Sequence, residues 1–478
     1  MRYWISDVWT TFKYSPNRNI ISVGIMTVAV IIIVAVVMIP RAIDTARERR
    51  EWNQFVYQSS ENYLYDFNYL MSVLEENWPF FNLSMSANGV NVHEVAANMR
   101  YILQSPEVEG ISVFTFLDLL REHFIWEIGQ IGHLNTIWQY EDYFGALEHK
   151  QWVRNFTRAL PHNVAMFQEI FTKPETVMFY EILRDIGGST LRSPRQTQIE
   201  SETSNLPVLE TEILQEGRIA YLAVNQMINV WDDHWIPSIG MGRYQQIMHN
   251  FHTEIKGFEH LIIDMRGNLG GVNHFFNLFI AGPLLSESMS LPMYIHYMGG
   301  DYSRRLRENH DLRMWGIYTT ERFNQQIASF TEPLPYLDTN IIFHYVYESE
   351  YATPAGYLLY EFYGSGTEEV IFDGTIWMLV DEYTASAAES AVAMFKLNDF
   401  ATVIGESTRG LFGTSNDPTI MIMSLPNTGI LVRFDVAYFT DRLGRPFQGY
   451  GITPHYFNRP NMDALETVLA MIEEREGH

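Results

Sequence analysis

Cysteine is absent from the 478 residues of this chain. Disulfide bonds, thiol nucleophiles and zinc–thiolate sites are therefore excluded. The absence fits an exported protein of a bacterium that does not rely on disulfides. Hydrophobic residues make up 47% and aromatic residues 14% of the chain, which is typical of a folded protein. Its length is enough for two or three domains.

Positive charge is also scarce, with 32 Lys and Arg against 57 Asp and Glu and a net charge of −25. Nucleic-acid binding depends on clustered Lys and Arg, and the only such cluster is at residues 47–50, so no nucleic-acid partner is expected. The turn at residues 267–271 lacks the lysine of a phosphate-binding loop. No metal-ligand spacing is found, so the sequence predicts neither a metal nor a cofactor.

One long apolar run stands out near the start of the chain. Ile20 to Ile39 is twenty residues without a charge, long enough to cross a bilayer as a helix. We expect residues 20–40 to form a single membrane anchor; a cleaved signal peptide and a buried core helix are the alternatives. Lys and Arg flank the run on both sides, so the positive-inside rule does not decide its orientation.

The remaining chain changes character along its length. Apolar residues at three- and four-residue spacing predict a helical domain, and from residue 208 short β-like runs alternate with helical ones, which indicates an α/β core. The expected order is a tail at 1–19, the anchor at 20–40, a stalk at 41–61, a helical domain at 62–187, a linker at 188–207, and a core domain at 208–478 with an insertion or cap at about 293–364.

The segment from Ile376 to Gly410 carries the clearest chemical signal. An apolar run ends at Val380, and a helix rich in small residues begins at Ser386. A hydroxyl at a strand-to-helix junction lies beside unpaired N–H groups that can bind a developing oxyanion, so Ser386 is the candidate nucleophile. Ser386 to Glu389 also fits a capping box, and the two interpretations are compatible.

A second segment, His260 to Gly271, reads HLIIDMRGNLGG. A strand runs into a turn with Gly267, Gly270 and Gly271, and glycines at such a place let backbone N–H groups approach a ligand closely. The alternative is a plain tight turn.

Four pieces in this order resemble peptidase family S41, which includes the tail-specific proteases and the tricorn-type core. They are GRIAYLAVNQM from Gly217, LIIDMRGNLGG, TASAAE leading to GESTRG, and GYGITP ending at Pro454. The resemblance implies an α/β (α+β) core of the ββα superhelix kind shared with ClpP and crotonases, and peptide hydrolysis without a cofactor. It puts Ser386 on the nucleophile and the N–H of Ala387, with that of Gly270 or Gly271, on the oxyanion hole.

The general base departs from the tail-specific pattern. Those proteases pair the serine with a lysine, and the matching position here is Leu411. Lys396 is the only lysine after Ser386, and ten helical residues at about 1.5 Å each put it out of reach, so a Ser–Lys dyad is not expected.

A neutral imidazole can take the serine proton instead. The tricorn-like branch places a histidine at a position that is about Ala223 here, whereas other S41 relatives draw it from the helical N-terminal region. His133, in Ile131-Gly132-His133-Leu134, is therefore the predicted base. A purely structural His133 and His274 as the base are the alternatives.

A third group would orient the histidine. Related sequences often carry glutamate where this chain has Gln448, which offers a carbonyl acceptor without a negative charge. Gln448 is the predicted third member, and Asp441 is a nearby carboxylate that could serve.

These expectations combine into a membrane-anchored serine-type peptidase with an extracytoplasmic catalytic domain and a protein or peptide substrate. The location outside the cytoplasm follows from the resemblance to exported hydrolases. One alternative is an inactive S41-like module that binds peptides or proteins at the cell surface, which the residues Leu411 and Gln448 motivate. The other is a crotonase-like acyl-CoA enzyme, which an anchored, exported domain disfavours.

Overall fold

The computed structural model describes only part of the chain. The described residues are 50–129, 131–137, 161–185, 206–228, 235–236, 241–291, 293–309, 317–318, 321, 324, 343–347, 350–352, 372–412 and 420–476. The expected anchor at 20–40 and the linker from 188 to 205 lie outside them. No helix within the described ranges is long and apolar enough to cross a membrane.

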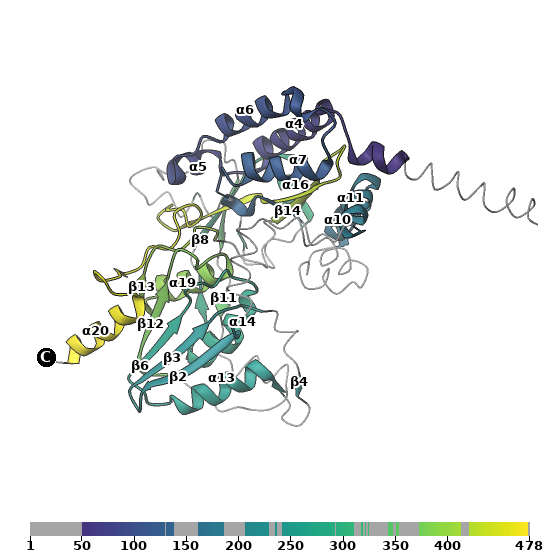
Figure 1. Ribbon diagram of the computed structural model, residues 1–478. Coiled ribbons are helices and arrows are strands. Elements are labelled where there is room, and N and C mark those ends of the chain that lie inside the picture. The colour runs from purple at the N-terminus through teal and green to yellow at the C-terminus, as the bar shows by residue number, and fades with distance from the viewer. Residues whose placement is uncertain are drawn as a thin grey trace, which may run out of the picture.

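A helical region comes first in the chain and forms the upper layer of Figure 1. Three of its helices begin at polar caps: the side chains of Ser59, Asn91 and Ser112 accept backbone N–H groups in the first turns. The elements are α4 (Ser60–Asn77), α5 (Phe81–Asn88), α6 (Val92–Leu103), α7 (Val113–Leu120), the π-turn η3 (Arg121–Ile125), the 3-10 turn η4 (Ile131–His133), α10 (Pro161–Phe171) and α11 (Pro174–Asp185).

A six-stranded sheet forms the centre of the second region, below the helices in Figure 1. Its order is β17 (Tyr456–Phe457), β13 (Thr402–Gly405), β12 (Thr375–Val380), β6 (His260–Asp264), β3 (Ile219–Val224) and β2 (Leu209–Gln215). Only β2 is antiparallel to its neighbour. The central strands read as continuous apolar runs because both of their faces are buried.

Helices cover the two faces of this sheet unequally. On one face Leu261 and Met378 pack in the main core with α13 (Arg243–Glu254), α14 (Asn273–Phe276) and α19 (Ala387–Leu397). On the other face Ile262 and Trp377 pack against α20 (Ala464–Glu476). The mixed α/β core preceded by a helical region is the fold class predicted from the sequence.

The remaining strands form smaller antiparallel sheets. One sheet has the order β16 (Ala437–Asp441), β8 (Met293–Tyr297), β10 (Phe343–Tyr347), β9 (Ile317–Tyr318), and another has the order β1 (Asn135–Thr136), β15 (Leu431–Asp435), β14 (Ile420–Ser424). Two-stranded pairs join β7 (Met289–Ser290) to β11 (Glu350–Ala352) and β4 (Trp235–Ile236) to β5 (Met241–Gly242). The segment expected as an insertion or cap, 293–364, contributes β8, which is hydrogen-bonded to β16.

The helical region is fixed to these strands by a buried carboxylate. Asp66, on α4, accepts hydrogen bonds from the backbone and side chains of Asn427 and Thr428 at 2.8–2.9 Å, in the turn that joins β14 to β15. Burial raises the pKa of Asp66 above its ordinary value, while these donors act in the opposite direction. The same turn precedes the strand that pairs with β1.

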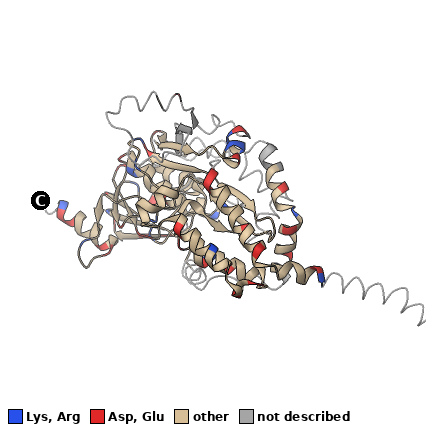
Figure 2. Cartoon of the chain, turned by 90° about the horizontal axis from the view of Figure 1, so that it is seen from above, with Lys and Arg blue, Asp and Glu red and all other residues tan. Residues whose placement is uncertain are grey.

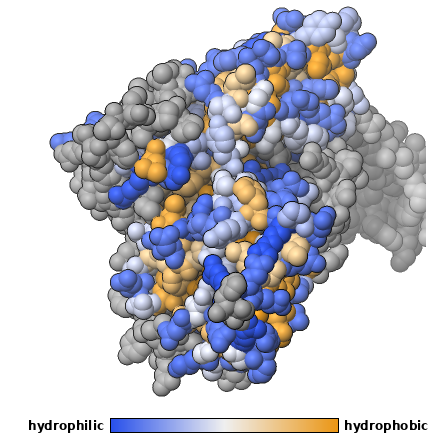
Figure 3. Space-filling view, turned by 90° about the vertical axis from the view of Figure 1, so that its left-hand side faces the viewer, coloured by the Kyte–Doolittle hydropathy of each residue, from blue (hydrophilic) through white to orange (hydrophobic). Residues whose placement is uncertain are grey.

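The charged residues on the surface reflect the acidic composition of the chain. Asp and Glu are scattered over the outer helices in Figure 2, with fewer Lys and Arg among them. Figure 3 shows that hydrophilic and hydrophobic residues are interspersed on one face of the molecule.

Candidate active site

Ser386 lies at the junction that the sequence predicts, between β12 and α19. Its backbone has φ 56° and ψ −120°, a conformation that costs a residue with a side chain about 1–3 kcal/mol. The surrounding loop supports it: Ala385 N–H donates to Asn268 O at 2.9 Å, and Thr384 Oγ1 donates to Met265 O at 2.9 Å. Both contacts reach the loop after β6, because β6 and β12 are parallel neighbours that end side by side.

His133 contacts the serine from the helical region. Its Nε2 lies 3.2 Å from Ser386 Oγ, although the two residues are 253 positions apart in the chain. The histidine side chain is 11% exposed. A tight turn brings it there, with positive φ at both Gly132 (58°) and His133 (50°).

Aromatic packing holds this turn in place. A Cβ added to Gly132 would lie 2.5 Å from Phe80 Cε2 and 2.8 Å from Trp78 Nε1. Glycine is therefore required at this position, both for its positive φ and for the close approach of the two rings.

Asp435 completes the arrangement on the other side of the imidazole. Its Oδ2 lies 2.8 Å from His133 Nδ1, and its side chain is 1% exposed. The pairing of β1 with β15 explains the contact. Asn135 lies opposite Arg433 in an antiparallel register, and continuing this register by two residues places His133 opposite Asp435.

The carboxylate settles the roles of the two ring nitrogens. A carboxylate oxygen only accepts, so Nδ1 carries the hydrogen and Nε2 is left to accept the Ser386 hydroxyl proton. The second oxygen of Asp435 is buried and has no hydrogen-bond partner among the described residues.

Backbone donors surround Ser386. A Cβ on Gly270 would lie 2.9 Å from both Ser386 Cβ and Ala387 N, so this glycine packs directly against the serine. The N–H of Gly270 itself donates to Asn268 Oδ1 at 2.8 Å. By contrast, the N–H groups of Gly271 and Ala387 have no acceptor within the described part of the chain.

Glu389 lies beneath the serine and is completely buried. One carboxylate oxygen accepts Ser386 N–H at 3.0 Å, and the other accepts Thr408 Oγ1 at 2.5 Å and Gly410 N–H at 2.7 Å. Burial raises the pKa of Glu389 to about 7, although these donors act in the opposite direction.

The other residues singled out in the sequence lie elsewhere. Gln448 is buried, and its Oε1 accepts Phe439 N–H at 2.8 Å, whereas the group bonded to His133 Nδ1 is Asp435. Asp441 pairs with Arg445 at 2.6 Å. His274 is an exposed residue of α14. Lys396 donates to Thr453 O at the far end of α19.

Asp435 is the residue that sequence reasoning missed. It directly follows the predicted strand Ile430 to Phe434, and nothing nearby marks it as different from any polar residue at a strand end. Its role depends on a two-residue strand, β1, that has no sequence signal of its own.

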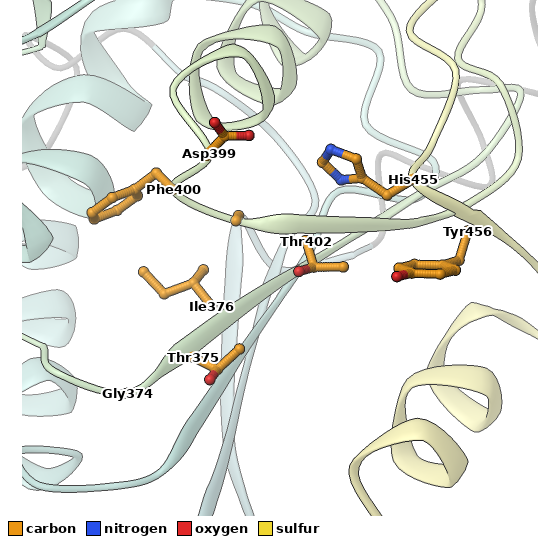
Figure 4. Close-up of a pocket in the computed structure, with 9 residues that line it drawn as sticks. Gly374, Thr375, Ile376, Asp399, Phe400, Thr402, His455 and Tyr456 are labelled. Carbon is orange, nitrogen blue, oxygen red and sulfur yellow. The ribbon is translucent and has the colours of Figure 1, made fainter. Parts of the chain in front are cut away.

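A surface depression lies away from Ser386, His133 and Asp435. It has a volume of about 550 Å³ and lies at the amino ends of β12 and β13, where Thr375, Asp399 and His455 contribute to its walls (Figure 4). Ser386 follows the carboxyl end of β12, at the opposite edge of the sheet. The described residues contain no cluster of acidic or histidine side chains suited to a metal ion.

The model of peptidase family S41 matches residues 218–457. Among solved structures, the chain is similar to a putative peptidase from Parabacteroides merdae at 16% identity, covering 87% of this chain and 96% of that one with a TM-score of 0.46. It is also similar to mature CPAF, at 13% identity, 83% and 92% coverage and a TM-score of 0.47. A lipoprotein from Streptococcus agalactiae has 14% identity, 87% and 97% coverage and a TM-score of 0.41. No curated protein matches the chain.

Proposed function

Because the chain belongs to peptidase family S41, we propose that it is a serine peptidase whose nucleophile is Ser386 and whose general base is His133. The observation that carries the proposal is the continuous line of contacts from Ser386 Oγ to His133 Nε2 at 3.2 Å and from His133 Nδ1 to Asp435 Oδ2 at 2.8 Å. Nucleophile, base and orienting carboxylate are thus within hydrogen-bond reach of one another.

Each residue has a defined task in this mechanism. His133 Nε2 accepts the hydroxyl proton as Ser386 Oγ attacks a peptide carbonyl, and it returns the proton to the leaving amine. Asp435 stabilises the imidazolium that forms between these steps. Water then attacks the acyl-enzyme, with the same imidazole as base. The bond broken is the peptide bond, and no cofactor takes part.

The oxyanion is assigned to the N–H groups of Ala387 and Gly271. The N–H of Gly270 is already bonded to Asn268, and Gly270 O accepts Met227 N–H. Across the trans peptide bond between the two glycines, the N–H of Gly271 points away from Met227. Two preorganised donors of this kind stabilise the negative charge that develops on the attacked carbonyl.

We extend the proposal to the cellular setting and to the fold. The apolar residues 20–40 anchor the protein in the membrane, and the catalytic domain faces away from the cytoplasm, where it meets protein or peptide substrates. The core is of the ββα superhelix kind, which the row of parallel strands flanked by α13, α14 and α19 supports.

The test is covalent labelling of the full-length chain in detergent with a fluorophosphonate probe, which reacts with activated serines. The wild-type chain should be labelled, and the Ser386→Ala chain should not. Ser390→Ala is the matched control, because Ser390 is a buried serine one turn further along α19. A folded wild-type chain that resists the probe would favour the alternative function, an S41-like module that binds peptides without cleaving them.

A further inference from the structure

Glu389 does more in this structure than cap a helix. Its carboxylate is the only group bonded both to the backbone of Ser386 and to the loop at residues 408–410, among the described hydrogen bonds. Glu389 is one turn past Ser386 on α19, whereas Thr408 and Gly410 belong to the loop that follows β13. It therefore joins two segments that converge beneath the nucleophile.

The loop at 408–410 is bonded in turn to the segment at 449–452. Gly449 N–H donates to Gly410 O at 2.8 Å, and Ile452 N–H donates to Thr408 Oγ1 at 2.7 Å. A Cβ on Gly410 would lie 2.9 Å from backbone atoms of Gly449, so the two chains are in direct backbone contact. The hydroxyl of Thr408 thus connects the Glu389 carboxylate to this second segment.

The second segment packs against the helical region beside the histidine. A Cβ on Gly449, where φ is +80°, would lie 2.9 Å from Ala87 Cβ, 3.2 Å from Ile131 Cδ1 and 3.3 Å from Leu83 Cγ. Ile131 is buried and begins the turn that ends at His133. The contacts therefore run from Ser386 through Glu389, Gly410 and Gly449 to the segment that carries the base.

We propose that Glu389 is a positioning residue that sets the distance between the serine and the histidine, by fixing the 408–410 and 449–452 segments against which the histidine turn packs. Glu389 acts through other residues and does not touch the substrate. The inference rests on the proposed function, because the distance matters only if His133 serves Ser386 as base.

Thr408 offers a way to test this with the whole chain. Thr408→Val keeps the shape of the side chain and removes the hydroxyl that donates to Glu389 and accepts from Ile452; Thr408→Ser keeps the hydroxyl. The measurement is fluorophosphonate labelling of the full-length chain, resolved into a binding constant and a maximal labelling rate per folded molecule. Thr408→Val should lower the maximal rate at least tenfold with a binding constant within about twofold of wild type, and Thr408→Ser should restore the rate.

A matched control separates positioning from general stability. Thr467 is a buried threonine of α20 whose hydroxyl accepts Arg459 N–H at 3.0 Å, at the opposite side of the large sheet. Thr467→Val should lower the unfolding midpoint without slowing the folded molecules. If folded Thr408→Val is labelled at the wild-type rate, the positioning role is wrong, whereas an unreactive wild-type chain would refute the proposed function instead.

Gly449→Ala gives an independent measurement if Thr408→Val does not fold. The added methyl group meets Ala87 and Ile131 at the far end of the chain of contacts, and Gly449 itself is not bonded to Glu389. The same loss of maximal rate is expected, and an unchanged rate would contradict the proposal.

Discussion

Ser386 Oγ and His133 Nε2 lie 3.2 Å apart, yet the segments that carry them are held in place by different kinds of interaction. These two segments are the serine half and the histidine half of the proposed site. The serine half is built from one strand, one turn and one helix that follow each other in the chain, braced by the loop after the neighbouring strand β6. The histidine half is a turn with positive φ at two successive residues, and its partners come from distant segments.

The serine half is thus determined by neighbouring elements of one sheet, whereas the histidine half is determined by long-range contacts. In the serine half, parallel pairing of β6 with β12 brings the loops together, so the site follows from the sheet. In the histidine half, Trp78 and Phe80 come from the turn between α4 and α5, whereas Asp435 comes from β15. The Asp66 contacts fix α4 to the turn before β15. The histidine half should accordingly be the more sensitive to substitution outside the reacting atoms.

The largest expected effect is the loss of the base. His133→Ala should lower the rate of fluorophosphonate labelling by roughly 10⁴- to 10⁶-fold, because the serine hydroxyl then has no proton acceptor. His274→Ala is the control, since His274 lies exposed on α14, and it should react like wild type. If His274→Ala loses reactivity and His133→Ala keeps it, the base has been assigned to the wrong half of the molecule.

The second effect concerns the orienting carboxylate. Asp435→Asn keeps the side-chain shape but removes the charge that fixes the Nδ1–H tautomer of His133, so labelling should slow by roughly 10²- to 10⁴-fold. Asp441→Asn is the control at the alternative carboxylate, which pairs with Arg445.

Equal reactivity of the two aspartate variants would contradict the orienting role of Asp435. A slow Asp441→Asn with a normal Asp435→Asn would return that role to the carboxylate considered from the sequence.

The third prediction compares two glycines with positive φ, one in the histidine turn and one in the loop between α13 and β6. Gly132→Ala forces a methyl group against Phe80 and Trp78 and should cost about 2–5 kcal/mol of unfolding free energy, together with most of the labelling rate. Gly257→Ala has φ +85° but meets no atom within 4 Å, so it should cost about 1–2 kcal/mol and leave labelling unchanged. Urea unfolding measures the free energy and labelling of the same samples measures the rate. Similar losses in the two glycine variants would show that the histidine turn is not tightly packed.

The smallest effect is a pH dependence of stability in the α/β region that contains the serine half. His252, on α13, is buried, and burial lowers its pKa to about 3. The unfolded chain takes up a proton near pH 6.5 that the folded chain resists, so stability falls as the pH falls below this value. Between pH 7 and pH 5 wild type should lose about 2 kcal/mol that His252→Leu does not lose. Parallel pH profiles of unfolding for the two chains would contradict this.

Asp66, in the helical region, contributes a pH dependence of stability with the opposite sign. Burial raises its pKa above 3.8, so its contribution to stability is present below that pH and is lost as the pH rises through the raised pKa. Acid therefore weakens the α/β region through His252, whereas the Asp66 contribution in the helical region is retained in acid.

Much of the serine half could be predicted from the sequence. The apolar run that ends at Val380 and the small-residue helix after Ser386 match β12 and α19 closely, because local patterns encode local elements. The resemblance to family S41 also directed attention to the helical region for the base, and the structure places His133 within reach of Ser386. The catalytic roles of these residues remain predictions.

The histidine half shows where the sequence ceases to be informative. Gln448 was assigned beside the histidine because relatives carry glutamate there, yet its carbonyl bonds to Phe439 N–H and the carboxylate beside His133 is that of Asp435. A motif shows which residue of this chain corresponds to which residue of a relative, but the contacts of that residue depend on how the strands are paired. The pairing of β8 with β16 was hidden in the same way, because long-range strand pairing leaves no mark on a single strand's pattern.

The separation of 253 positions between His133 and Ser386 in the chain has a consequence for the cell that makes this protein. Ribosomes release the helical region first and the serine much later, so a nascent or truncated chain carries the proposed base without the proposed nucleophile. The proposed activity begins only after β15, which is synthesised later still, has paired with β1. Under the proposed function, an unfinished chain therefore lacks the means to cleave the other new chains around it.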